Sequence, residues 1–199
     1  MKTQLKLSLL LTAIGMFLNG TVTSQVLKYI PKSFDLVIAG TTNVHDYETK
    51  VTSMTGELVM NNPSQVKSFT LNIPVKSIKS KEKLMDTKTY EAFNADKHPT
   101  ITFRLAEVQS VQTNGSDINL TALGNVTING TTKRVILKAT GKLLTTGTYQ
   151  FKGSVSMKMT DYGMKPPTAM MGMMKVGDGV TLKYNVTFVE ENLLSQLNN

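Results

Sequence analysis

Apolar and polar residues alternate along most of the chain, a pattern typical of β-strands with one buried face. The clearest stretch is 118–128, where Ile, Leu, Ala, Gly, Val and Ile share one face and mostly polar residues the other. Further strands are predicted at 135–143, 149–159, 180–188, Phe34–Ile38, Met54–Met60, Phe69–Val75 and Ile101–Leu105. The alternation therefore predicts eight strands.

Turn residues and one exception to the alternation divide these strands. Asn114-Gly115, Asn129-Gly130 and Thr146-Gly147 predict tight hairpins. The stretch from Lys81 to about Asn94 instead carries apolar residues at roughly helical spacing, namely Leu84, Met85, Tyr90 and Phe93. We predict one or two short helices there, between the third and fourth strands, with Ser80 as a candidate N-cap.

Eight amphipathic antiparallel strands favour an all-β fold that closes into an eight-stranded barrel with a short helical insertion. A sandwich of two sheets is the alternative. An outer-membrane barrel would also alternate, but it needs aromatic girdles, and the chain is 7% aromatic and has no Trp. A small closed barrel either fills with side chains or holds one ligand.

The first 24 residues have the features of a secretory signal peptide. Lys2 and Lys6 precede an apolar run from Leu7 to Leu18, which is shorter than the roughly 20 residues of a membrane span. We predict cleavage between Ser24 and Gln25, which leaves 25–199 as a single domain with a core at about 34–189. The predicted location is periplasmic or secreted.

Composition excludes several classes of site. The chain has no Cys, so neither disulfides nor thiolate metal sites can form. Its formal net charge is +8, but the lysines are scattered over strand positions, which does not indicate nucleic-acid binding. The two histidines, His45 and His98, lack spaced metal ligands; we interpret His45-Asp46 as a turn and His98-Pro99 as a helix-to-strand junction. No catalytic, cofactor or metal site is predicted.

The connection from Thr160 to Gly179 is the most informative segment. It is long for a β protein with tight hairpins, and such loops are often lids or binding segments. It contains Met164, Met170, Met171, Met173 and Met174, and methionine adapts to varied apolar partners. The run is either a lid or a plug for one barrel end. Small residues on inward faces either relieve crowding or leave room for a guest, and they are Ala122, Gly124, Ala139, Gly141 and Gly153.

Five motifs occur in order along the chain: FDLVIAGTTNVHD at 34–46, LNIPVKSIKS at 71–80, PTITFRL at 99–105, GNVTINGTTKRV at 124–135 and DYG at 161–163. Together they resemble the YceI-like family of exported bacterial proteins, also called lipid- or polyisoprenoid-binding proteins. The resemblance implies an extended, lipocalin-like eight-stranded antiparallel barrel with a long apolar pore, a polyisoprenoid guest, and a periplasmic or secreted location.

From the resemblance and the inward positions together, we expect a protein that is not an enzyme and that carries or sequesters a polyisoprenoid or similar apolar lipid. The candidate ligand-binding residues are Phe69, Leu71, Phe103, Leu120, Tyr149, Phe151, Met157, Met164, Met170, Met173, Tyr184 and Phe188. Lys165 and Lys175 are candidates for contact with an anionic head group, and peripheral membrane contact is a further hypothesis. The alternatives are an interaction protein with a filled barrel, or a hydrolase that uses His45 and Asp46. The sequence predicts no oligomeric state.

Overall fold

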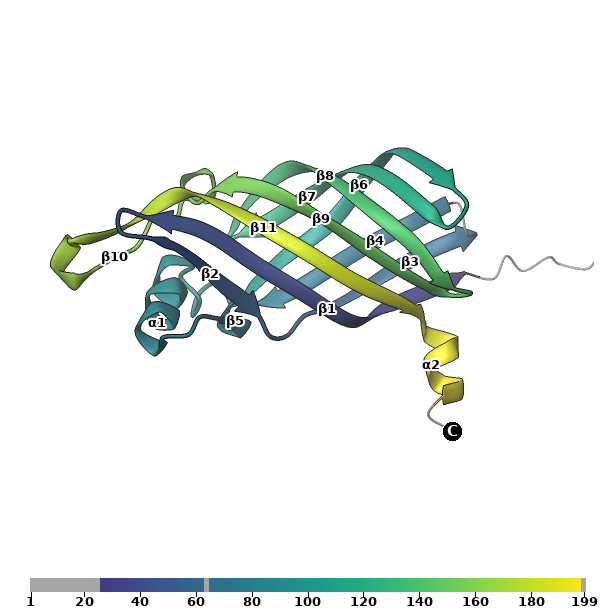
Figure 1. Cartoon of the computed structure of the whole chain (residues 1–199), viewed down its shortest axis with the longest axis horizontal. Helices are drawn as coiled ribbons and strands as arrows, with labels where there is room; N and C mark the ends of the chain where they lie inside the picture. The colour runs from purple at the N-terminus through teal and green to yellow at the C-terminus, as the bar shows by residue number, and fades with distance from the viewer. Residues whose placement is uncertain (1–25, 63–64, 198–199) are drawn as a thin grey trace, which may run out of the picture.

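The protein is an elongated β-barrel with one helix at each end (Figure 1). The computed structural model describes residues 26–62 and 65–197, so the predicted signal peptide at 1–24 lies outside the described residues. The strands are β1 (Leu27–Thr42), β2 (Asp46–Val51), β3 (Thr55–Asn62), β4 (Gln65–Pro74), β5 (Ile78–Lys79), β6 (Thr100–Asn114), β7 (Asp117–Ile128), β8 (Thr131–Thr145), β9 (Thr148–Lys158), β10 (Thr168–Ala169) and β11 (Met174–Glu190). The helices are α1 (Lys83–Ala92) and α2 (Glu191–Leu197), with 3-10 turns η1 (Val75–Ser77), η2 (Thr160–Tyr162) and η3 (Met170–Gly172).

Eight of these strands close the predicted barrel. They follow the order β11-β9-β8-β7-β6-β4-β3-β1, and β11 pairs back onto β1 in an antiparallel register that places Leu36 opposite Tyr184. Closure removes the exposed edges that an open sheet would carry. The eight-stranded antiparallel barrel is therefore confirmed, and the two-sheet sandwich is wrong.

The predicted hairpins and the helical insertion also form. Asn129 and Gly130 both have left-handed φ, of 48° and 73°, as a two-residue type I′ turn requires. Helix α1 lies between β4 and β6, which are the third and fourth barrel strands. Glu82, not Ser80, occupies its N-cap position. The Ser80 hydroxyl instead accepts a hydrogen bond from the Glu82 N–H, at 3.1 Å, just ahead of the helix.

The early strands are longer than predicted, and β2 and β5 were missed. Strand β2 pairs with the far half of β1, where Gly40 lies opposite Tyr47, and it also pairs with β5. Pairing with strands distant in sequence accounts for the extra strand residues. Strand β1 extends beyond its short apolar run because β2 and β11 flank it. Residue alternation within one segment carries no information about such partners.

The connection from Thr160 to Gly179 is also more ordered than predicted. Strand β11 begins at Met174, well inside the predicted loop, and β10 pairs with it through Thr168 opposite Lys175 and Ala169 opposite Met174. The tip of this hairpin is η3. The prediction of one long connection from Thr160 to Gly179 was therefore wrong, because β11 begins inside it and continues as a hairpin beyond the barrel wall.

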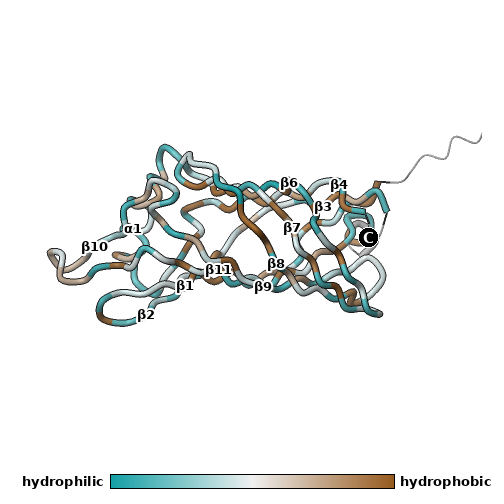
Figure 2. The backbone as a smooth tube through the Cα atoms, turned by 90° about the horizontal axis from the view of Figure 1, so that it is seen from above, coloured by the Kyte–Doolittle hydropathy of each residue, from teal (hydrophilic) through white to brown (hydrophobic). Residues whose placement is uncertain are grey.

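Apolar faces point inward, and Figure 2 shows hydrophobic and hydrophilic stretches interspersed along the strands. Aromatic rings gather toward the end of the barrel that carries α2. Tyr29 and Tyr149 meet edge to face with centroids 5.4 Å apart, and Phe69 contacts Phe188 at 5.6 Å. Edge-to-face rings of this kind fill space densely and add to the burial energy. This cluster fills one end of the barrel.

The inward small residues relieve crowding around these rings. A Cβ at Gly124 would overlap Phe103, one at Gly141 would overlap Phe151, and one at Gly153 would overlap Tyr184. Each of these three glycines thus makes room for an aromatic side chain of a neighbouring strand. Of the two interpretations of the small residues, the structure supports relief of crowding at these positions.

Candidate functional site

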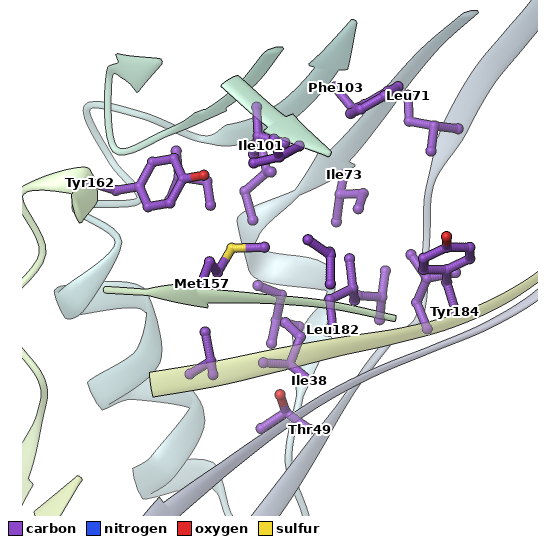
Figure 3. A pocket seen from close by; sticks show the side chains of 18 of the residues that line it. Ile38, Thr49, Leu71, Ile73, Ile101, Phe103, Met157, Tyr162, Leu182 and Tyr184 are labelled. Atoms are coloured by element: carbon purple, nitrogen blue, oxygen red, sulfur yellow. The ribbon is translucent and has the colours of Figure 1, made fainter. Parts of the chain in front are cut away.

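An apolar cavity of about 250 Å³ runs inside the barrel (Figure 3). Its lining comes from all eight barrel strands, from β2 and β5, from α1 and from the segment after β9. Side chains from opposite walls, such as Ile73 and Leu182, point into the same space. Pockets for small molecules are concave and mostly apolar, and this cavity is close in size to the smallest of them.

Most of the predicted ligand-binding residues line this cavity. Period-two alternation placed the strand residues among them on the inner face, because successive side chains of a strand point to opposite sides of the sheet, whereas Met164 was predicted from the methionine-rich connection. The residues that line it are Phe69, Leu71, Phe103, Leu120, Phe151, Met157, Met164, Tyr184 and Phe188. Their part in binding a ligand stays a prediction.

Three predicted residues lie outside the lining. Tyr149 belongs to the aromatic cluster, where it stacks on Phe151 with the ring planes 16° apart. Met170 and Met173 are 63% and 71% exposed at the tip of the β10–β11 hairpin. Met164, in contrast, is buried against the cavity. The methionine segment therefore divides into one inward residue and an outward tip, which neither a simple lid nor a simple plug describes.

Sequence reasoning missed the contributions of α1 and β2. Met85, Thr89 and Phe93 line the cavity from one face of the helical region. Their spacing of four residues is the signal that could have found them. Tyr47 and Thr49 line it from β2, where alternation from 47 to 51 is present but short.

The polar groups that line the cavity are few, and its tyrosines are uncharged. Burial raises the pKa of Tyr184 to about 12, and it also raises the pKa values of Tyr47 and Tyr162 above that of a free phenol. A negative charge on Asp161 adds to the effect at Tyr162. All three phenols are therefore neutral near pH 7. Lys88 and Lys158 also reach the lining, and the Lys88 ammonium forms an ion pair of 2.7 Å with Glu91. The interior suits an uncharged chain.

Both histidines lie where a structural role explains them. His45 is exposed in the turn before β2, and its Nδ1 lies 2.8 Å from the backbone oxygen of Asp46. His98 follows α1, and its N–H donates to the Asn94 carbonyl at 2.8 Å. Neither lines the cavity. Within residues 26–62 and 65–197, no group of three acidic or histidine side chains is placed to hold a metal ion.

The inner face of the barrel is thus mainly apolar on every strand. The model of the YceI-like domain matches residues 31–188. This chain belongs to the YceI-like family. The match takes in every barrel strand apart from the first residues of β1 and the last residues of β11.

Curated relatives of this YceI-like chain come from pseudomonads. A UPF0312 protein of Pseudomonas paraeruginosa is 36% identical over 112 residues, covering 52% of this chain and 55% of the relative. A UPF0312 protein of Pseudomonas aeruginosa is 35% identical over the same length. The alignment thus spans about half the length of these relatives.

Solved structures share the fold at low sequence identity. BcnA of Burkholderia cenocepacia has a TM-score of 0.61 at 19% identity, covering 77% of this chain and 95% of BcnA. A domain from Saccharophagus degradans described as polyisoprenoid binding has a TM-score of 0.66 at 10% identity, covering 83% of this chain and 99% of the domain. A Campylobacter jejuni YceI protein has a TM-score of 0.54 at 17% identity, covering 72% and 84%. Among the described residues, no helix is long and apolar enough to cross a bilayer.

Proposed function

We propose that this YceI-like protein binds a long apolar lipid, of the polyisoprenoid class, inside the barrel, and that it acts as an exported carrier or sequestering protein. The observation that carries the proposal is the cavity itself, which is lined almost wholly by hydrocarbon and thioether side chains. Hydrocarbon buried there contributes about 0.8 kcal/mol per methylene before the cost of ordering the chain.

The known relatives support this ligand class. The Saccharophagus domain with the same fold is described as polyisoprenoid binding. A branched isoprenoid chain also suits a cavity lined by branched aliphatic, thioether and aromatic side chains, because such walls offer many contacts at van der Waals distance. A periplasmic or secreted location agrees with the signal-peptide pattern of residues 1–24.

The polar side chains suggest how the guest lies. Tyr47, Lys88 and Thr89 line the cavity near α1, whereas Phe188 and the aromatic cluster lie toward the α2 end. We propose that the polar head of the guest lies beside α1 and that its tail points toward the aromatic cluster. Lys165 and Lys175, beyond the same end, remain candidates for an anionic head group.

Two alternatives are less well supported. A filled barrel used only for interaction would leave no room for a guest, and the cavity of about 250 Å³ argues against it. A hydrolase would need His45 and Asp46 to face the cavity, but His45 in the turn and Asp46 at the start of β2 are both exposed, and neither lines the cavity. A binding protein is the function that the site supports best.

Native mass spectrometry of the mature protein, purified from its own host and then extracted with organic solvent, tests the proposal. We expect a co-purified polyprenyl-type lipid at a stoichiometry near one. A protein that is empty as isolated, and that also fails to take up added isoprenoids of several lengths, would contradict it.

A further inference from the structure

Two hairpins at the α1 end of the barrel are joined by one asparagine. The Asn43 side-chain amide donates to the Met173 carbonyl at 2.8 Å, and its oxygen accepts from the Lys175 N–H at 2.7 Å. The Asn43 N–H also donates to the Lys175 carbonyl at 3.1 Å. The turn between β1 and β2 and the β10–β11 hairpin therefore form one projecting unit (Figure 1).

This unit presents large apolar side chains to water. Val44 is 66% exposed in the β1–β2 turn. On the other hairpin Met170, Met171 and Met173 are 63%, 105% and 71% exposed. We call these four residues the apolar tip. Met170 and Met171 also have left-handed φ values of 51° and 56°, a conformation that residues with a side chain adopt at a cost.

The apolar tip continues into the cavity. Met164, Pro167 and Val176 line the cavity and belong to the segment that carries the hairpin. Figures 1 and 2 both place the β10 hairpin at the outermost point of the α1 end. On α1, Leu84 is 59% exposed at this same end. Exposed apolar residues therefore lie around the end of the barrel nearest the polar part of the cavity.

The positive net charge of the chain, +8 over the full sequence, favours an anionic partner. Lys165 and Lys175 flank the hairpin, and the acids near it are Asp46 at the start of β2 and Asp161 in η2. Asp178, farther along β11, already accepts hydrogen bonds from the Thr160 N–H and hydroxyl, at 2.9 and 2.7 Å. Juxtaposed lysines and apolar side chains are the combination by which proteins attach to the surface of anionic membranes.

The shape of the tip favours a bilayer over a protein. Protein interfaces are broad and are anchored by Trp, Tyr or Arg in pockets, whereas the apolar tip is a narrow projection of Met and Val. Such a projection can enter lipid without a matching surface. We propose that the apolar tip docks this end of the barrel on an anionic lipid bilayer, so that a guest moves between bilayer and cavity without crossing water. The transfer step rests on the proposed function, but the docking does not.

Vesicle co-sedimentation of the full mature protein tests the docking. The vesicles contain phosphatidylethanolamine with phosphatidylglycerol, or phosphatidylcholine alone. We expect binding to the anionic vesicles, weakened at least about tenfold when Val44, Met170, Met171 and Met173 are all replaced by Ser, because the buried apolar area is lost. The matched control replaces Val111, Ile136, Leu143 and Leu144 by Ser; these residues are also exposed, lie away from the tip, and should leave binding unchanged.

Three outcomes would overturn the docking: no binding of the wild type, equal binding of the tip variant, or dimerisation through the tip in analytical ultracentrifugation without vesicle binding. Mass spectrometry of the same preparations separates docking from lipid carriage. A tip variant that still holds lipid but does not bind vesicles supports docking alone. Vesicle binding by a protein that holds no lipid would contradict only the proposed function.

Discussion

The hydroxyl of Tyr184 donates a hydrogen bond to the backbone carbonyl of Lys138 at 2.9 Å, at the point where β8 stops pairing with β9. The last backbone pair of that ladder is Ala139 with Gly153. Beyond it, 131–138 of β8 and 154–158 of β9 have no register with each other in the described structure. A side chain from β11 thus takes the place of the next ladder bond and links β11 to β8 across β9.

Replacing Tyr184 by Phe should weaken this link between β11 and β8. The variant removes the hydroxyl and leaves the Lys138 carbonyl without its donor, so we expect a loss of about 1 kcal/mol in the free energy of unfolding. Denaturant unfolding measures the loss, and amide hydrogen exchange should accelerate around 138 and 153–155. Tyr47→Phe is the control, because its hydroxyl makes no hydrogen bond with another described residue. Equal stability of Tyr184→Phe and wild type would contradict the role of the bond.

The same site predicts an effect for Gly153. A Cβ there would overlap the Tyr184 hydroxyl and approach the Lys138 carbonyl to 2.5 Å. We expect Gly153→Ala to cost about 1–3 kcal/mol of stability through overpacking. Gly179→Ala is the matched control, since a Cβ at Gly179 meets nothing within 4 Å. Thermal unfolding distinguishes the two variants. Equal melting temperatures would show that the residues around Gly153 accommodate a methyl group without loss of stability.

Adjacent residues of β8 allow a direct test of the cavity. Leu137 lines it, whereas Ile136 points outward and is 55% exposed. Leu137→Trp should fill part of the cavity and reduce bound lipid about tenfold, since the added ring takes the volume of several methylenes. Ile136→Trp should keep its lipid. Organic extraction of both proteins measures this, after circular dichroism has shown that each folds. Equal lipid content would place the guest elsewhere.

Asp86 should make the start of α1 sensitive to acid. Burial alone would raise the pKa of its carboxyl, but hydrogen bonds from the Ser80 N–H and hydroxyl, at 2.6 and 2.8 Å, and the charge of Lys79 hold it below its usual value. A group with a depressed folded pKa stabilises the protein above its unfolded pKa of about 3.9 and loses that contribution as pH falls through the folded pKa.

Asp86→Asn should therefore cost about 1–2 kcal/mol at pH 7 and progressively less as the pH falls through the lowered pKa of Asp86. Asp96→Asn is the control, because the Asp96 side chain is 94% exposed and its ion pair with Lys76 contributes little. Unfolding curves at several pH values measure both variants. A cost for Asp86→Asn that did not shrink in acid would show that the charge is not what stabilises this helix start.

Local features were predictable from the sequence because they depend on neighbouring residues. Side chains alternate between the faces of a strand, so residues such as Phe103 and Met157 could be placed inside the barrel before the fold was known. Asn129-Gly130 predicted its hairpin because few other residue pairs tolerate two left-handed conformations. Helix α1 was predictable from apolar spacing, although its N-cap was not.

Only the tertiary structure decided how these strands pair into a closed barrel and how large a cavity remains inside it. Leu36 pairs with Tyr184, which lies far along the chain. Gly153 likewise makes room for the ring of Tyr184 on another strand. The position of Met170 and Met173 followed from β11 continuing past the barrel to pair with β10. Alternation is the same for a strand that fills a barrel and one that lines a cavity, because it reports the direction of each side chain and not the distance to the opposite wall. The sequence by itself therefore determined which side chains face inward, and long-range packing determined that they enclose a cavity.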